Sequence, residues 1–254
     1  MRIPLNAARA LLFVAFIVTW QLLSMYHYLN PLVFSSPSAA SYHLYLLLSG
    51  HGDLPDFFQS LWSTLVELTL AAALILAIGV PFGVLLGWNR FGQVTLMPLM
   101  IAFFSIPSIV LYPLIYLSFG LGITSKVIFG TIVGLFAVLE NSSAGAKSIP
   151  MEYISISRSL GFSNFQLLRK IVLPSALPYI TSGIRLGVSF ALAGIIAGEY
   201  IASTTGLGEL VVTALTLFRI DDMFAVILIV IGLGTLVNLL IILIERREQR
   251  YRRF

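Results

Sequence analysis

Long apolar stretches dominate the chain, and short polar segments separate them. A helix needs about 20 mostly apolar residues to cross about 30 Å of hydrocarbon. Six stretches qualify, some only with their flanks, and they predict spans at 9–28, 60–88, 94–119, 126–145, 178–202 and 223–244. The sequence lacks the alternation, over about ten residues, that is typical of a membrane β-barrel. The pattern therefore predicts one all-α integral membrane domain with six transmembrane helices.

The composition agrees with this class of protein. Hydrophobic residues make up 58% of the 254 residues and charged residues only 10%. A soluble domain of this size needs more polar surface. The absence of cysteine excludes disulfides, thiolate catalysis and thiolate metal sites.

The distribution of charge predicts that both ends of the chain lie in the cytoplasm, because cytoplasmic loops carry the excess of Lys and Arg. In this orientation the outer segments keep only Lys126 and Arg219 as basic residues. They also hold the acidic residues Asp53, Asp56, Glu209, Asp221 and Asp222. The cytoplasmic segments then hold Arg2, Arg9, Arg90, Lys147, Arg158, Arg169, Lys170, Arg246, Arg247, Arg250, Arg252 and Arg253.

Two outer segments are too long for simple turns. Residues 29–59 mix proline, serine and a short apolar stretch, which predicts a helix along the outer interface. Residues 203–222 open with a glycine turn and continue as an amphipathic helix too short to span.

A small charged hairpin interrupts the apolar pattern in the predicted cytoplasmic loop 146–175. Pro150 and Glu152 suit the start of a helix, and Gly161 suits the left-handed residue that ends one. Ser163 and Gln166 have the spacing of a capping box, which predicts a second helix directly afterwards.

The second helix of this hairpin has a predicted apolar face. Phe165, Leu168 and Ile171 share one side at helical spacing. Pro174 and Pro178 mark the entry to the fifth span. These features alone leave two interpretations open: an amphipathic connector resting on the membrane, or an element displayed to the cytoplasm.

The hairpin resembles a motif of known transporters. The spacing from Gly161 through Ile171 to Leu173-Pro174 resembles the EAA loop of binding-protein-dependent ABC importer permeases. Ser155, Ile156 and Ser157 stand where that family usually has Glu-Ala-Ala. The stretches "IPSIVLYPLIYLSFGLG" and "AGEYIASTTGLG" resemble its nitrate, sulfonate and taurine branch, to which permeases for vitamin precursors and bicarbonate are similar.

This resemblance implies the type I ABC importer permease fold and a place in the bacterial plasma membrane. It also implies a homodimer or pseudo-dimer of permeases, two cytoplasmic ATPase subunits that use ATP and Mg, an external substrate-binding protein and a small nutrient as substrate. The chain itself would bind no cofactor, and no nucleic acid is expected as a partner. The resemblance assigns ATPase coupling to Glu152, Ser155, Gly161, Phe165, Leu168, Arg169, Ile171, Leu173 and Pro174.

Motifs that the sequence lacks limit the alternatives. No phosphate-binding loop of the form G-x-x-x-x-G-K-[ST] occurs, so the chain is not expected to be an ATPase or another enzyme. His27, His43 and His51 match no compact metal site. A free-standing carrier or channel is the main alternative, but it gives no reason for the hairpin. An intramembrane enzyme is a more distant one.

Three residues within the predicted spans are candidates for the translocation path. Glu67 and Glu199 are ionisable, and such groups are costly in lipid, so they should face protein or water. Glu67 is expected to face a cavity or bridge helices, while Glu199 either borders the path or caps a neighbouring helix. Pro107 stands with two other prolines in the third span and predicts a kink beside a cavity.

Overall fold

The structure is a computed structural model that describes residues 5–251, with side chains described for residues 7–243. The described part of the chain is helical and contains no β-strand. Its α-helices are α1 (Leu5–Met25), α2 (Pro37–Leu48), α3 (Phe57–Trp88), α4 (Met97–Phe104), α5 (Tyr112–Phe119), α6 (Ile123–Lys147), α7 (Met151–Ser159), α8 (Asn164–Leu167), α9 (Leu173–Ile201), α10 (Leu207–Thr216) and α11 (Ile220–Tyr251). Short segments of other helical geometry are η1 (Gly92–Leu96), η2 (Ser108–Leu111) and η3 (Leu168–Val172).

The predicted spans correspond to helices of the structure. Five described helices are long and apolar enough to cross a membrane, and a bent pair of shorter helices provides a sixth candidate. That pair covers the predicted span 94–119, but its two parts, Gly92–Phe104 and Ser108–Phe119, meet at 79°. Pro107 lies at this break, where its missing N–H and its fixed φ end the regular helix. The kink is confirmed, and the element is a pair of helices bent at a break rather than one continuous helix.

The fifth span starts earlier than the sequence predicts. The helix expected at 178–202 is continuous with the second helix of the hairpin, from Asn164 to Ile201. Pro174 and Pro178 therefore do not separate the hairpin from the span. The π-helical turn η3 lies directly before Pro174, and such a turn changes the hydrogen-bond register where a proline lacks its donor.

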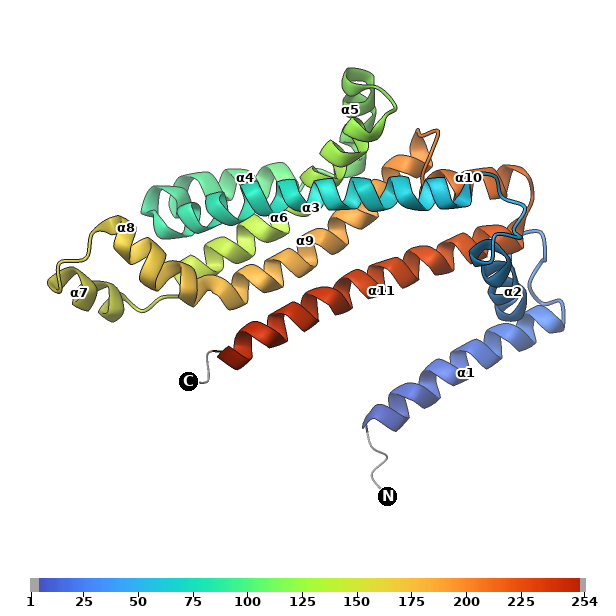
Figure 1. Cartoon of the computed structure of the whole chain (residues 1–254), viewed down its shortest axis with the longest axis horizontal. Helices are drawn as coiled ribbons and strands as arrows, with labels where there is room; N and C mark the ends of the chain where they lie inside the picture. Colours follow the sequence, from blue (N-terminus) through green and yellow to red (C-terminus); the bar gives the residue numbers. More distant parts are fainter. Residues whose placement is uncertain (1–4, 252–254) are drawn as a thin grey trace.

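Helices α3, α6 and α9 run side by side and form the centre of the fold (Figure 1). The G-x-x-x-G spacing on α3 is used for packing against α6. A Cβ atom on Gly83 would lie 2.7 Å from the carbonyl oxygen of Leu139, and one on Gly87 would lie 2.1 Å from that of Ser143. The two backbones approach too closely for any larger residue at these positions, so this end of the bundle is held tightly.

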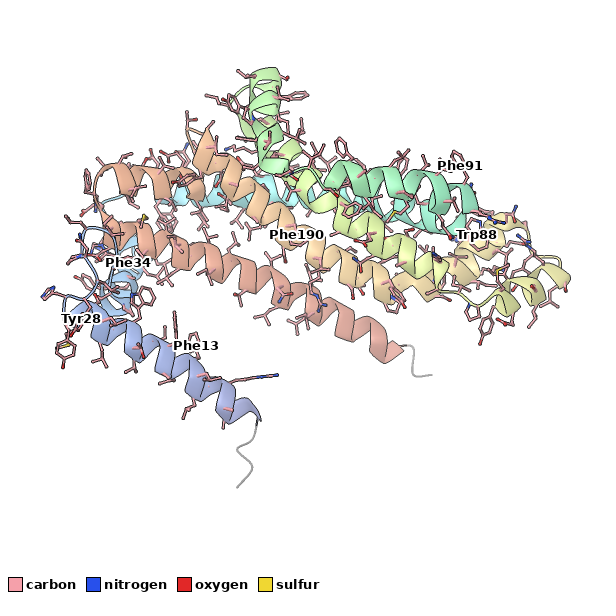
Figure 2. The ribbon with its side chains drawn as sticks, turned by 180° about the vertical axis from the view of Figure 1, so that it is seen from behind. Phe13, Tyr28, Phe34, Trp88, Phe91 and Phe190 are labelled. Carbon is pink, nitrogen blue, oxygen red and sulfur yellow. The ribbon has the colours of Figure 1, made fainter. Side chains whose placement is uncertain are left out.

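Helix α1 lies apart from this central bundle in Figure 1. The apolar window Ala7–Met25 is 0% buried. Phe13 on this helix is exposed, and so are large apolar side chains elsewhere, such as Phe91 and Phe190 (Figure 2). An apolar exterior of this extent is what lipid contact requires.

An ionic network joins several elements at the end of the bundle that holds α2 and α10. His43 Nδ1 lies 2.9 Å from Asp222 Oδ1, and Arg219 donates to Asp222 at 2.7 Å. Arg219 also reaches Asp53 at 2.9 Å. The network ties α2 and the loop before α3 to the start of α11. Helix α2 confirms the helix predicted within 29–59, and α10 confirms the one predicted within 203–222.

The orientation of the chain in the membrane can be tested with reporters placed in the loops. Several basic residues of the two chain ends lie outside the described residues: Arg2, Arg252 and Arg253 are not described, and neither are the side chains of Arg246, Arg247 and Arg250. We expect reporter fusions at Gly52 and Gly122 to read external and fusions at Phe91 and Ser148 to read cytoplasmic. The measurement is paired alkaline phosphatase and fluorescent-protein activity at each site. A cytoplasmic reading at Gly122 would contradict the predicted topology around this bent pair of helices.

Candidate functional site

The hairpin between α6 and α9 folds as its sequence predicts. Helix α7 ends at Ser159, and Gly161, two residues later, has the left-handed φ of +81°. The capping box at the next helix is complete. Gln166 N donates to Ser163 Oγ at 3.3 Å, and Ser163 N donates to Gln166 Oε1 at 2.8 Å. Both predictions about the turn are confirmed, and the turn fixes the angle between α7 and α8.

The inner face of the hairpin is anchored on the membrane helices. Ile154 of α7 and Val172 of η3 are buried in one apolar cluster. This cluster also contains Val84 of α3, Ala146 of α6 and Ala176 of α9. Displacement of the hairpin would therefore act directly on three central helices.

The outer face of the hairpin is exposed. Phe165 is 68% exposed, although it is a large apolar side chain at a polar end of the molecule. Leu168 and Ile171 instead pack against the apolar cluster, so the expectation that all three share one face does not hold. The turn η3 changes the helical register over these residues. The other predicted coupling residues divide in the same way: Glu152, Ser155, Gly161, Arg169 and Leu173 are exposed, and Pro174 is half-buried.

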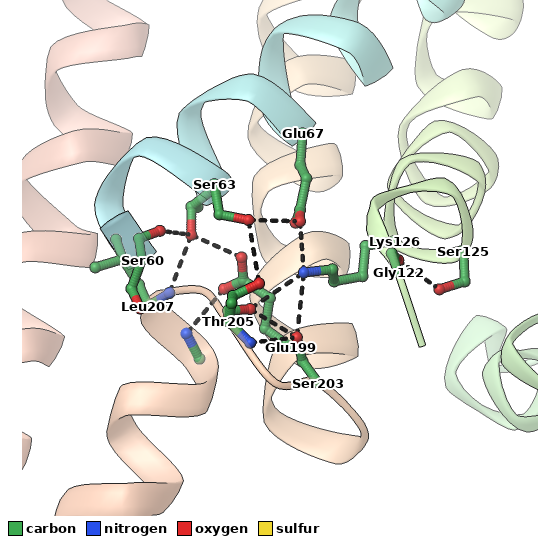
Figure 3. Close-up of polar contacts among 12 residues, drawn as sticks. Ser60, Ser63, Glu67, Gly122, Ser125, Lys126, Glu199, Ser203, Thr205 and Leu207 are labelled. Carbon is green, nitrogen blue, oxygen red and sulfur yellow. Dashed lines mark hydrogen bonds and ion pairs between the residues drawn. The ribbon is translucent and has the colours of Figure 1, made fainter. Parts of the chain in front are cut away.

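A second group of polar residues lies buried near the opposite end of the same helices (Figure 3). Glu67 of α3 and Lys126 of α6 form an ion pair at 2.5 Å, with side-chain exposures of 0% and 1%. The Lys126 ammonium also donates to Ser203 Oγ and to the Thr205 carbonyl oxygen, both at 3.1 Å. We call Glu67, Lys126, Glu199 and their hydroxyl partners the outer polar cluster.

Glu199 connects this cluster to α10. Its carboxylate accepts from Thr64 Oγ1 at 2.6 Å and from the backbone N–H of Gly208 at 2.8 Å. Thr64 Oγ1 in turn accepts from the backbone N–H of Leu207 at 3.0 Å. The carboxylate and the hydroxyl thus satisfy two free N–H groups in the first turn of α10, where negative charge is favoured.

The cluster shows which of the alternative contacts predicted for Glu67 and Glu199 are present. In this structure Glu67 bridges helices, and Glu199 caps a neighbouring helix. Neither side chain is exposed, since their relative exposures are 0% and 1%. The Lys126 ammonium pairs with Glu67, and Glu67 Oε2 has no hydrogen-bond partner among the described residues. A role of Glu67, Glu199 or Pro107 in the translocation path stays a prediction.

Lys126 is the residue of this site that the sequence does not reveal. Its place at the predicted start of a span makes it look like an ordinary flanking charge. The signal that could have identified it is the depth of Glu67, because a carboxylate inside a span needs a cationic partner from another helix.

Gly206 offers a direct test of how tightly the loop before α10 covers Glu199. The residue has φ +122°, and a Cβ atom there would lie 2.1 Å from Glu199 Oε1. We expect Gly206→Ala to lower the unfolding free energy by about 1–3 kcal/mol, from strain and from displacement of the carboxylate. The measurement is thermal unfolding of the purified protein in detergent.

Gly232→Ala is the matched control for this variant. A Cβ atom at Gly232 would have no neighbour within 4 Å, and alanine is the better helix former inside α11. Equal stability of the two variants would show that the loop does not close over Glu199.

Comparison with known proteins identifies the class of the chain. Residues 79–250 match the family described as "Binding-protein-dependent transport system inner membrane component". The chain therefore belongs to this family of membrane transport permeases, as the hairpin motif predicts.

Two relatives illustrate the similarity in sequence. The chain is 32% identical over 180 residues to the formylaminopyrimidine transport permease protein ThiX of Halalkalibacterium halodurans, covering 71% of this chain and 72% of the relative. It is 28% identical over 232 residues to the taurine transport system permease protein TauC of Escherichia coli, covering 91% and 84%.

The structural comparison confirms the fold. A chain of the inward-facing MetNI methionine ABC transporter superimposes with a TM-score of 0.65 at 23% sequence identity. The match covers 75% of this chain and 94% of that one. The predicted type I ABC importer permease fold is confirmed.

Proposed function

We propose that this chain is the permease subunit of an ATP-driven importer for a small nutrient, and that the α7–α8 hairpin docks on a cytoplasmic ATPase subunit. The observation that carries the proposal is the division of the hairpin into two faces. Its inner face is anchored on α3, α6 and α9, while Phe165 projects from its outer face. An exposed apolar side chain on an anchored element is suited to fill a pocket on a partner.

The continuous helix from Asn164 to Ile201 supplies a route for coupling. Its 38 residues begin in the hairpin and end beside the outer polar cluster, where Glu199 lies. At 1.5 Å per residue this is a distance of about 55 Å. A partner that moves the hairpin would therefore tilt a rigid element whose far end is bonded to α3 and α10. This is the physical basis for alternating access in the proposed mechanism.

The remaining partners follow from the family and its members. ATP and Mg would be used by the ATPase subunit, and an external binding protein would deliver the solute. Two copies of the permease would form the pathway in a bacterial plasma membrane. Relatives named for formylaminopyrimidine and taurine transport support a small polar organic solute.

The test is transport by vesicles that contain the permease, an ABC ATPase subunit that co-purifies with it and an external binding protein. Labelled taurine and formylaminopyrimidine serve as probes, and binding-protein-stimulated ATP hydrolysis is recorded in parallel. We expect hydrolysis to require the permease and uptake of at least one probe to require ATP. Uptake driven by an ion gradient without the ATPase would instead identify the chain as a free-standing carrier.

A further inference from the structure

A polar pocket lies between the hairpin and the adjacent ends of two membrane helices. It has a volume of about 360 Å³. Three basic residues from three elements line it: Arg90 after α3, Lys147 at the end of α6 and Arg158 on α7. No acidic residue is among its lining residues.

The positive charges of this pocket have no acidic partner among the described side chains. In the part of the chain whose side chains are described, Arg90, Lys147 and Arg158 make no ion pair or side-chain hydrogen bond. Like charges that converge on one concave site repel one another and create a positive potential, which an anion would relieve. The pocket therefore has the electrostatics of an anion site.

The walls of the pocket are held in place by packing. Gly87 brings α3 against the backbone of α6 at Ser143. On α7, Ile154 is buried in the apolar cluster and Arg158 follows it by one helical turn. Residues four apart lie on the same face of a helix. Burial of Ile154 thus directs Arg158 toward the pocket, which both residues line.

The position of the pocket at the ends of the membrane helices indicates the kind of anion that it binds. Trp88, the last residue of α3, lines the pocket together with Asn89 and Gln93. Trp88 lies at the end of the bundle that holds the hairpin (Figure 2). Tryptophan at the end of a span is typical of the headgroup level. Basic pockets between membrane helices on the cytoplasmic side bind the headgroups of anionic lipids.

We infer that this pocket binds a phosphate group, supplied by the headgroup of an anionic phospholipid or by free phosphate. Guanidinium groups bind phosphate oxygens with two parallel hydrogen bonds, and the lysine adds a point charge. Because α7 forms one wall, the bound phosphate would link the position of the hairpin to the ends of α3 and α6. The inference does not depend on which solute is transported.

Tryptophan fluorescence of the full chain tests this site. The chain has three tryptophans, so Trp20→Phe with Trp62→Phe leaves Trp88 as the reporter. The purified protein, without any ATPase, is titrated with short-chain phosphatidylglycerol, with phosphatidylcholine of equal chain length and with sodium phosphate at constant ionic strength. We expect a saturable change with phosphatidylglycerol, weakened about tenfold or more by Lys147→Gln with Arg158→Gln.

The control removes the same amount of charge from nearby residues outside the pocket. Arg169→Gln with Lys170→Gln changes residues that do not line the pocket, and its titration should match that of the unsubstituted protein. Saturation by free phosphate at equal or lower concentration, lost in the pocket variant, would support the site and identify free phosphate as the source. Equal responses to both lipids that neither double variant changes, with none to phosphate, would overturn the inference.

Discussion

Replacing Lys126 by methionine is expected to cost the protein about 3–5 kcal/mol of stability. The ammonium of Lys126 is the cation that pairs with Glu67, and both side chains are fully buried. After the substitution, Ser63 Oγ, 3.1 Å away, is the donor that remains to the Glu67 carboxylate. A buried carboxylate without a counter-charge is among the most destabilising single changes in a protein. We expect a large loss of folded protein after extraction and a lowered unfolding temperature.

Two further variants separate this effect from simple loss of a lysine. Adding Glu67→Gln to Lys126→Met removes the unpaired charge and should recover most of the lost stability, because the whole pair is then neutral. Lys147→Met removes an exposed lysine from the same helix and should change stability by less than about 0.5 kcal/mol. Unchanged stability of Lys126→Met alone would mean that the buried pair does not form.

Replacing Phe165 by aspartate is expected to release the ATPase subunit and abolish uptake while leaving the permease folded. The side chain is 68% exposed, so the substitution disturbs little packing within the chain. In the complex it would place a carboxylate in an apolar pocket, which is strongly unfavourable. We expect the ATPase retained on purification to fall about tenfold or more, equivalent to about 1.4 kcal/mol. Permease abundance is measured by immunoblot of the same membranes.

Leu168→Asp should behave differently although it lies only three residues further along. Leu168 packs against the apolar cluster under the hairpin, so the charge should disorder the hairpin and lower abundance as well. Tyr45→Asp is the control at the opposite end, because Tyr45 is 66% exposed on α2 and should not affect ATPase retention. Normal ATPase retention in the Phe165 variant would mean that this side chain lies outside the docking surface.

Features governed by local sequence could be predicted. The six apolar stretches, the capping box at Ser163 and the left-handed Gly161 depend on residues close together in the chain. In each case one short segment contains the whole signal, so the inference needs no knowledge of tertiary contacts.

Features that depend on contacts between residues far apart in the sequence could not be predicted. Lys126 looks like a flanking charge until Glu67 of another helix meets it. The prolines predict a kink in the third span but not its angle of 79°, which depends on how the two halves pack. The different burial of Phe165 and Leu168 follows from the register of η3 and from the cluster beneath it, neither of which helical spacing alone specifies.

The central claim, that the α7–α8 hairpin is the contact with the ATPase, can be tested by site-specific crosslinking. The chain has no cysteine, so Phe165→Cys introduces a single attachment point for a photoreactive maleimide. In the assembled complex we predict a covalent adduct between permease and ATPase from this position, and none from the control Tyr45→Cys on α2. A complex that retains its ATPase but yields no adduct from Phe165→Cys would contradict the assignment of the hairpin.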